Sequence, residues 1–260
     1  MPTEKTPKVS LLIPAYNREP FIAAAVGSVL RQTFSDFELL VWDDGSTDKT
    51  ADVAERAAGN DPRVKMVRAA HAGVCASINA AARQLTGEYF GWVDSDDAIA
   101  PAALAETVAF LDAAANADVG MVYTDYLTMD EGGLVGGLGT RTKIPYSKDR
   151  LLIDFMTFHF RLMRRNVFDR AGGIDETIGG AEDYDLCLRL SELTEIRHLA
   201  RPLYFYRVHR SSISSEMRLK QIMQSKEAIR RALVRRAMEK DFEIDVELIG
   251  RFHLRRKSAK

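Results

Sequence analysis

The sequence has few of the features that mark an exported or disulfide-stabilised protein. Only two of its 260 residues are cysteine, Cys75 and Cys187, and they form no C-x-x-C pair. This predicts reduced, structural thiols and neither a disulfide framework nor a metal cluster. The polar residues 1–8 contain no apolar segment of a secretion signal. The composition therefore favours a cytoplasmic protein.

Long hydrophobic runs and a strong charge of one sign are also missing. The longest apolar-rich stretch, residues 21–30, is too short to span a bilayer, which takes about 20 residues. The net charge is −1, but residues 216–260 carry 13 basic and 7 acidic side chains, a net of +6, and leave residues 1–215 at −7. An acidic body argues against a nucleic-acid partner. The basic tail is a candidate for peripheral contact with the cytosolic face of a membrane.

Strands and helices alternate through the first half of the sequence. Short β-branched apolar runs predict strands, and apolar positions at helical spacing predict a helix after each. This rhythm predicts βαβ units and a mainly parallel sheet, in which ligands bind beyond the carboxyl ends of the strands. The predicted strands are residues 9–13, 37–42, 64–67, 89–93 and 119–123.

The rhythm changes after residue 125. The glycine-rich residues 132–139 predict a hairpin or loop, residues 158–163 and 203–208 predict strands, and residues 182–193 predict a helix. Residues 216–240 place apolar positions on one side and arginines elsewhere, which is typical of an amphipathic helix. We therefore expect a nucleotide-binding half over residues 9–125, an acceptor-binding half over 126–215, and a basic helical extension over 216–260.

Acidic residues follow two of the predicted strands at the same edge of the sheet. Asp94 and Asp96 flank Ser95, and two carboxylates so close repel unless a cation lies between them. Hard oxygen ligands of this kind favour Mg²⁺ or Mn²⁺, with substrate phosphates completing the shell. Asp44 follows another strand and can accept a hydrogen bond from a base N–H or a ribose hydroxyl.

Each acidic group also has a simpler structural interpretation. Asp97 has the residue type and position of an N-cap for the following helix, and Ser46 or Thr47 can cap the helix after residue 47. The acidic triplet alone is therefore a weak signal for a metal site.

An ordered set of motifs resembles the large bacterial family-2 glycosyltransferases of the GT-A fold, of the polysaccharide-biosynthesis type. The resemblance covers residues 9–214 and keeps the family's motif order. Its motifs are Ile13-Pro14-Ala15-Tyr16-Asn17, Gln32-Thr33-Phe34, Asp43-Asp44-Gly45-Ser46-Thr47-Asp48, His71-Ala72-Gly73-Val74, Asn79, Gly87-Glu88-Tyr89, Asp94-Ser95-Asp96-Asp97, Gly172-Gly173-Ile174-Asp175-Glu176, Glu182-Asp183-Tyr184-Asp185-Leu186 and Tyr206-Arg207-Val208-His209.

The resemblance implies a GT-A α/β fold with a C-terminal helical extension and a nucleotide-diphospho-sugar donor, with a UDP-sugar expected. Pro14, Tyr16 and Asp44 would line the nucleoside pocket, with Tyr16 stacking on the base. Asp94 would meet the ribose or a metal-bound water. One departure is Ile78, where many relatives carry an arginine, so that a donor contact is lost or comes from elsewhere, for example from His71 or Arg68.

The resemblance also implies a divalent cation, Mn²⁺ or Mg²⁺, and an inverting reaction. Asp96 would ligate the metal that bridges the diphosphate, His209 would be a further metal or diphosphate ligand, and Asp183 would be the catalytic base. The acceptor would be a saccharide, a lipid-linked molecule or a protein.

The chemistry of sugar transfer agrees with these roles. The departing diphosphate gains charge that a metal can stabilise, and the attacking hydroxyl must give its proton to a carboxylate on the acceptor side. Asp183 follows Gly179-Gly180-Ala181 at the start of a predicted helix. Its alternative role is that of a first-turn acid that favours the helix dipole.

Other functions explain the motifs less well. The acidic clusters lack the D-x-D-x-T/V pattern of aspartyl phosphatases, and residues 14–17 are not the glycine-rich basic loop that a nucleotidyltransferase needs. A non-catalytic nucleotide-binding or scaffolding protein of the same fold remains the alternative. It would need Asp44 and Asp96 but not Asp183.

Overall fold

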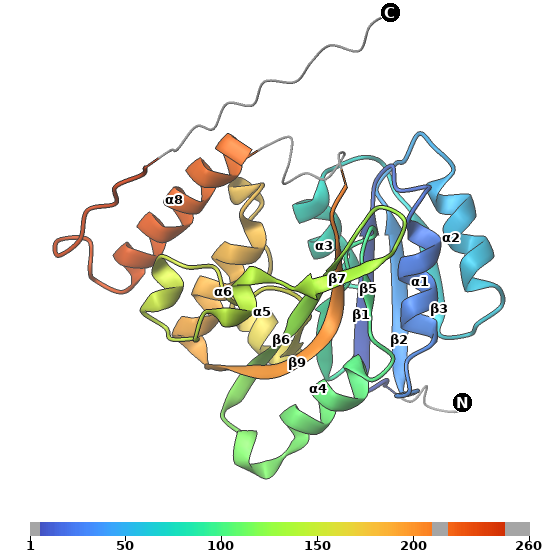
Figure 1. The fold of residues 1–260 in the computed structure, drawn as a ribbon, viewed down its shortest axis with the longest axis horizontal. Coiled ribbons are helices and arrows are strands. Elements are labelled where there is room, and N and C mark those ends of the chain that lie inside the picture. Colours follow the sequence, from blue (N-terminus) through green and yellow to red (C-terminus); the bar gives the residue numbers. More distant parts are fainter. Residues whose placement is uncertain (1–5, 210–217, 248–260) are drawn as a thin grey trace, which may run out of the picture.

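A computed structural model describes residues 6–209 and 218–247 (Figure 1). Helices and strands alternate through the first half, as the sequence predicts, and a longer, more irregular region follows. In chain order the elements are β1 (Val9–Ala15), α1 (Ile22–Leu30), β2 (Phe37–Asp43), α2 (Thr50–Ala58), β3 (Val64–Arg68), α3 (Val74–Ala82), β4 (Tyr89–Trp92), β5 (Ala98–Ile99), α4 (Ala103–Asp112), β6 (Val119–Met129), β7 (Val135–Leu138), β8 (Arg161–Arg164), α5 (Arg165–Arg170), α6 (Glu182–Leu193), β9 (Glu195–Arg207) and α8 (Arg218–Arg235), with 3-10 turns at Ala114–Asn116, Thr140–Lys143, Arg150–Leu152 and Glu176–Ile178.

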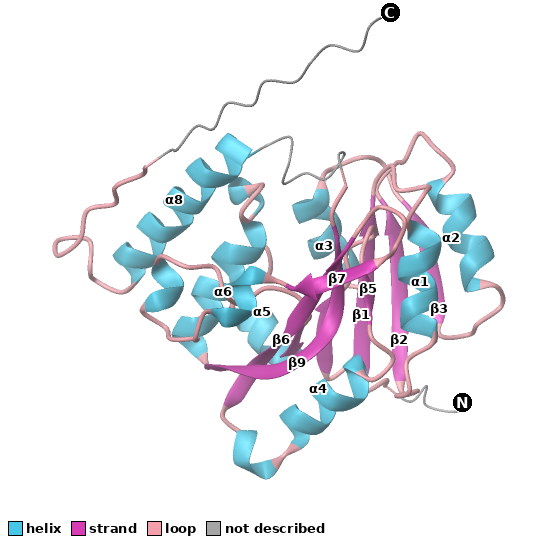
Figure 2. Cartoon of the chain, in the orientation of Figure 1, coloured by secondary structure: helices cyan, strands magenta, loops and turns pink. Residues whose placement is uncertain are grey.

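One sheet runs through the molecule in the order β3-β2-β1-β4-β8-β6-β9-β5, with β7 paired to β6 (Figure 2). The first four strands are parallel. β8 is antiparallel to both β4 and β6, and β5 is antiparallel to β9. Among the described strands of the second half, only β6 and β9 pair in parallel. The α/β class is as predicted, but the sheet is mixed rather than mainly parallel. The reason is that β8 and β5 lack the helical crossovers that return a strand in the same direction.

The starts of β8 and β9 differ from the predicted ones. β9 begins at Glu195, eight residues before the predicted strand. The sequence does not predict this first part because it is largely exposed and shows no apolar run. β8 begins at Arg161, so residues 158–160 lead into the strand rather than forming it. The glycine-rich segment forms the predicted hairpin, in which β7 pairs antiparallel with β6.

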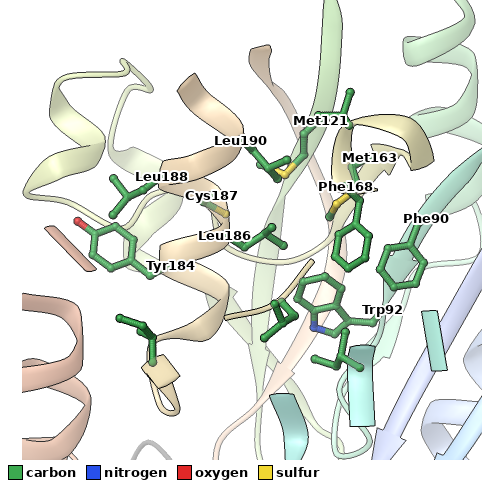
Figure 3. Packing of buried hydrophobic residues seen from close by; sticks show 14 of the residues in the cluster. Phe90, Trp92, Met121, Met163, Phe168, Tyr184, Leu186, Cys187, Leu188 and Leu190 are labelled. Atoms are coloured by element: carbon green, nitrogen blue, oxygen red, sulfur yellow. The ribbon is translucent and has the colours of Figure 1, made fainter. Parts of the chain in front are cut away.

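Apolar side chains cover both faces of the sheet. Val9, Leu11 and Ile13 of β1 pack on one face with α1, α2 and α4, and Leu12 packs on the other face with α3, α5 and α6. Such alternation is what a strand buried on both sides requires. The core on the face covered by α3, α5 and α6 is called the second core. Figure 3 shows it, with Leu186 and Cys187 of α6 on the side towards the aromatic residues of the sheet and α5. Cys75 and Cys187 are both buried and free, as predicted.

The amphipathic helix α8 lies against α6 (Figure 1). Ala228, Ala232 and Leu233 are buried in the second core. Four arginines at or just beyond its C-terminal end pair with acids of the same chain. The pairs are Arg230 and Arg231 with Glu227, Arg231 with Asp175, and Arg235 and Arg236 with Glu192. These contacts favour a helix docked on the protein over one whose arginines face a membrane. Among the described helices, none combines the length and the apolar character needed to cross a bilayer.

Candidate active site

The acidic loop after β4 is fixed by its last residue. Asp97 is buried and accepts hydrogen bonds from the Tyr204 hydroxyl at 2.8 Å and from the backbone N–H of Arg207 at 2.7 Å. Burial, together with the charges of Asp96 and Asp94, raises the pKa of Asp97 well above its usual value. Asp97 therefore anchors the loop to β9. It is not the N-cap of the next helix, since α4 begins at Ala103 with Ala102 before it.

Asp96 lies between two cationic or basic side chains. One of its carboxylate oxygens is 3.0 Å from His209 Nε2 and 3.2 Å from Arg18 Nε. The fold thus brings together the two predicted metal ligands, Asp96 and His209. It adds Arg18, which directly follows the Ile13–Asn17 motif and is not among the predicted site residues. His209 reaches this point because β9 ends at Arg207, whose guanidinium donates to the backbone oxygen of Asp96 at 2.7 Å.

The residues around Asp96 fit a divalent cation that is held jointly with substrate. Within residues 6–209 and 218–247, no three His, Cys, Asp or Glu side chains gather at one point. Mg²⁺ commonly takes only one or two carboxylates from the protein and completes its shell with water and phosphate oxygens. Asp96 with His209 would supply the protein's share of such a shell.

A second group of residues lies at the ends of β1 and β2. Tyr16 is exposed, and its ring stacks on His71, with 4.1 Å between centroids. Asp44 is buried, and its carboxylate accepts hydrogen bonds from the backbone N–H groups of Ala72 and Gly73 at 2.8 and 2.9 Å. It also lies 2.8 Å from His71 Nδ1. Asp44 therefore fixes the loop that carries His71 beneath the exposed Tyr16 ring.

Two other predicted positions are covered. Pro14 is buried within β1, beside Trp42 of β2. Ile78 is buried among the core residues of α3, so this position contributes packing. Of the two residues considered as replacements for the missing arginine, His71 lies beside Tyr16, whereas Arg68 is held by surface acids of α2.

Asp183 lies in the first turn of α6 and is held at both oxygens. Oδ1 accepts a hydrogen bond from the backbone N–H of Tyr184 at 2.8 Å, and Oδ2 accepts one from the Arg161 guanidinium at 3.2 Å. The same guanidinium lies 3.0 Å from His159 Nε2, and this ring nitrogen is 3.2 Å from Asp94 Oδ2. A continuous chain of polar contacts thus runs from Asp94 through His159 and Arg161 to Asp183.

Sequence reasoning missed His159 and Arg161. Residues 158–163 have the composition of an ordinary strand, and nothing local marks the two side chains as members of a site. Antiparallel pairing explains their position: because β8 runs against β4, the start of β8 lies beside the carboxyl end of β4, where Asp94 follows. Burial raises the pKa of Asp94, but His159, Arg161 and Arg18 outweigh it and leave that pKa below its usual value.

Asp185, two residues further along α6, forms a structural pair. Its carboxylate is buried and bonds Arg189 at 2.7 Å, as the i,i+4 spacing predicts. Arg189 in turn donates to the backbone oxygen of Gly173 at 2.7 Å. This pair holds the glycine turn that precedes α6.

The environment of Glu182 raises its pKa, in contrast to that of Asp94. Burial and the neighbouring charge of Asp183 raise the pKa of Glu182 to about 7. Its carboxylate accepts a hydrogen bond from the backbone N–H of Gly180 at 2.6 Å. The folded protein therefore keeps a proton on Glu182 at pH values where the unfolded chain, with a pKa near 4.5, has lost it.

Glu182→Gln is expected to stabilise the protein more at pH 8 than at pH 5. Because the folded-state pKa is raised, ionised Glu182 costs stability increasingly as the pH rises from about 4.5 to 7, and the uncharged amide removes that cost. The difference between the two pH values should be about 2 kcal/mol. Urea unfolding of both proteins at each pH measures it. An equal change at the two pH values would show that Glu182 is already ionised in the folded state at pH 5.

The sequence matches a known protein family. The family model described as glycosyl transferase family 2 matches residues 10–172. The chain is 32% identical over 211 residues to a chondroitin synthase of Escherichia coli, which covers 81% of this chain and 30% of the relative. It is also 32% identical over 210 residues to a hyaluronan synthase of Pasteurella multocida, covering 81% of this chain and 21% of the relative. The chain thus spans less than a third of the length of these two relatives.

Solved structures share the fold. S. aureus TarS, residues 1–349, in complex with UDP-GlcNAc superposes with a TM-score of 0.66 at 22% identity, covering 87% of this chain and 71% of that one. The mannosyltransferase PcManGT from Pyrobaculum calidifontis, in complex with GDP-Man and Mn²⁺, gives a TM-score of 0.65 at 20% identity, covering 89% and 65%. The predicted GT-A fold is confirmed by these neighbours. Since the family model covers more than half of the sequence, the chain belongs to glycosyl transferase family 2.

Proposed function

We propose that this protein transfers a sugar from a nucleotide-diphosphate donor to an acceptor hydroxyl, with a divalent cation and inversion of the anomeric carbon. The observation that carries the proposal is the separation of two acidic centres within one connected site. Asp96 follows β4 and lies beside His209, while Asp183 lies on α6 and is joined to Asp94 through two buried side chains. Single displacement needs such a division, because the leaving diphosphate and the incoming hydroxyl lie on opposite sides of the sugar.

The donor would bind the half of the chain over residues 9–125. The Tyr16 ring would stack on the base, and the loop held by Asp44 would form the rest of the pocket. Pro14, which is buried, would act only by shaping the end of β1 beneath this pocket. Asp94 would accept a hydrogen bond from a ribose hydroxyl or from a metal-bound water. A cation held by Asp96 and His209 would stabilise the charge that develops on the diphosphate.

The acceptor would bind the half over residues 126–215. Asp183 would accept the hydroxyl proton as that oxygen attacks the anomeric carbon, and both of its oxygens keep a lone pair for this purpose. The related synthases make chondroitin and hyaluronan, which supports a saccharide acceptor in polysaccharide biosynthesis. The UDP-GlcNAc complex of TarS supports a UDP-sugar donor, and the Mn²⁺ in PcManGT supports a divalent cation.

UDP with Mn²⁺ is expected to raise the melting temperature by about 5–10 °C. A ligand at about 100 times its dissociation constant stabilises by roughly 2.7 kcal/mol, and one kcal/mol shifts the melting temperature of a protein of this size by about 2–4 °C. Differential scanning fluorimetry with UDP, GDP and dTDP measures the shift, and EDTA should remove most of it. A shift with GDP alone would change the proposed base, whereas no shift with any of the three would contradict the proposal.

The non-catalytic alternative makes the same binding prediction, so turnover must separate the two. A panel of nucleotide sugars assayed for metal-dependent release of nucleoside diphosphate does this. A protein that only binds nucleotide would show the thermal shift and release nothing from any donor.

A further inference from the structure

Arg161 is a buried cation in a largely apolar setting. Its side chain is 1% exposed and lies at the start of β8 against the rings of Trp92 and Phe155, at 5.0 and 5.8 Å. A cation so far from water is costly unless charged and polar partners surround it. Its partners are Asp183, His159, the backbone oxygen of Thr157 and the Cys187 sulfur.

The four side chains that run from Asp94 through His159 and Arg161 to Asp183 differ in their exposure to solvent. The carboxylates at the two ends are partly open, with the Asp94 side chain 38% and the Asp183 side chain 26% exposed. The two middle members are closed off, with His159 at 5% and Arg161 at 1%. A ligand can therefore reach Asp94 and Asp183, while the middle pair can act only through them.

We propose that Arg161 is the positioning residue for the base Asp183, and that His159 supports it from the donor side. This inference rests on the proposed function. The guanidinium fixes Oδ2 while the Tyr184 N–H fixes Oδ1, so the plane of the Asp183 carboxylate is set before an acceptor arrives. His159 stacks on Tyr204, at 5.0 Å between centroids, and so lies in a fixed place between Asp94 and Arg161.

The geometry of a guanidinium is necessary for this role. Arg161 uses one nitrogen towards Thr157 and Cys187 and the other towards His159 and Asp183. Lysine would keep the charge, but a single ammonium on a flexible stem cannot reproduce a planar fork with two separated donors. Misplacement of a reacting group by about 1 Å can cost on the order of 10²-fold in rate.

Arg161→Lys is therefore expected to lower kcat by about 10²-fold, while the donor KM and the donor dissociation constant change less than about twofold. Arg164→Lys is the matched control on the same strand. Arg164 donates to the backbone oxygens of Val119 and Leu111, away from the acidic groups, so its replacement should lower the melting temperature and leave kcat unchanged.

A double-mutant cycle separates positioning of Asp183 from a general structural role. If Arg161 acts through the base, Arg161→Lys should slow transfer in the wild-type background but hardly at all in the Asp183→Asn background. Equal losses in both backgrounds, or an unchanged kcat for Arg161→Lys, would overturn the inference. If Arg161→Lys does not fold, the same double-mutant cycle is made with His159→Gln and Asp183→Asn. Additive losses of transfer rate in that cycle would also overturn the inference.

Failure of the proposed function gives a different result. If Asp183→Asn itself transferred at the wild-type rate, the assignment of the base would be wrong whatever Arg161 does. If Asp183→Asn transferred slowly and the rate loss from Arg161→Lys added to it, the proposed function would stand and only the positioning role of Arg161 would be excluded.

Discussion

Asp183→Asn is expected to lower the rate of sugar transfer by about 10²- to 10⁴-fold while donor and metal affinity stay nearly unchanged. General base catalysis contributes a factor of this size, or roughly 3–5.5 kcal/mol of barrier. Asparagine keeps the shape of the side chain, and its amide oxygen can still accept the Arg161 hydrogen bond, but it cannot take the acceptor proton. Donor binding should be spared because Asp183 lies on α6, whereas Asp96 follows β4.

Steady-state transfer and donor calorimetry on the same preparations test this expectation. Asp185→Asn is a matched control, since it places an amide on the same helix and breaks the buried pair with Arg189. That variant should lose stability and keep its catalytic rate once folded. NMR of the anomeric signal of the product gives the stereochemistry. Wild-type transfer by Asp183→Asn would show the base assignment to be wrong, and retention of configuration would exclude single displacement.

The sequence predicts the first half of the fold well because local signals there agree with long-range ones. β1, β2 and β4 are largely buried and therefore read as apolar runs, in which Ser10 of β1 and Glu38 of β2 are polar exceptions. Each strand leads directly to residues of the candidate site. Asp94 and Asp96 are visible in the sequence for the same reason: they interrupt such a run where a parallel sheet places its ligands.

The missed residues have partners distant in sequence. Arg18 meets Asp96 across 78 positions, and the contact between His159 and Asp94 depends on β8 running antiparallel to β4. No local pattern encodes either arrangement. The first part of β9 was missed for another reason, since it forms an exposed region of the sheet with β6 and has no apolar period.

The aspartates of the loop after β4 have different environments. The three aspartates of the loop are the same residue type, yet Asp97 is buried against Tyr204 while Asp96 contacts Arg18 and His209. Burial of Asp97 fixes the backbone on which Asp94 and Asp96 stand. The environment of each aspartate depends on whether its side chain points into the sheet. In a short loop the sequence pattern does not predict which side chain does so.

Asp96→Asn is expected to remove the metal dependence of donor binding and to lower transfer by roughly 10²- to 10³-fold. A cation that stabilises a departing diphosphate contributes several kcal/mol, and each 1.36 kcal/mol is a factor of ten in rate. The amide keeps a hydrogen-bond acceptor for Arg18 but loses the negative charge that draws a hard cation. His209 alone would then hold the ion, and a single imidazole is a weak site for Mg²⁺ or Mn²⁺.

Calorimetry of UDP binding with Mn²⁺ and with EDTA distinguishes this role from loss of folding. The wild-type affinity should fall on chelation to about the value that Asp96→Asn shows under both conditions, and the two proteins should then be indistinguishable. Asp52→Asn is the control, because Asp52 pairs with Arg68 on the surface of α2 and its replacement should leave the response to EDTA intact. If Asp96→Asn still lost affinity on chelation, the cation would have to be held elsewhere, and Asp96 would serve mainly as the counter-charge of Arg18.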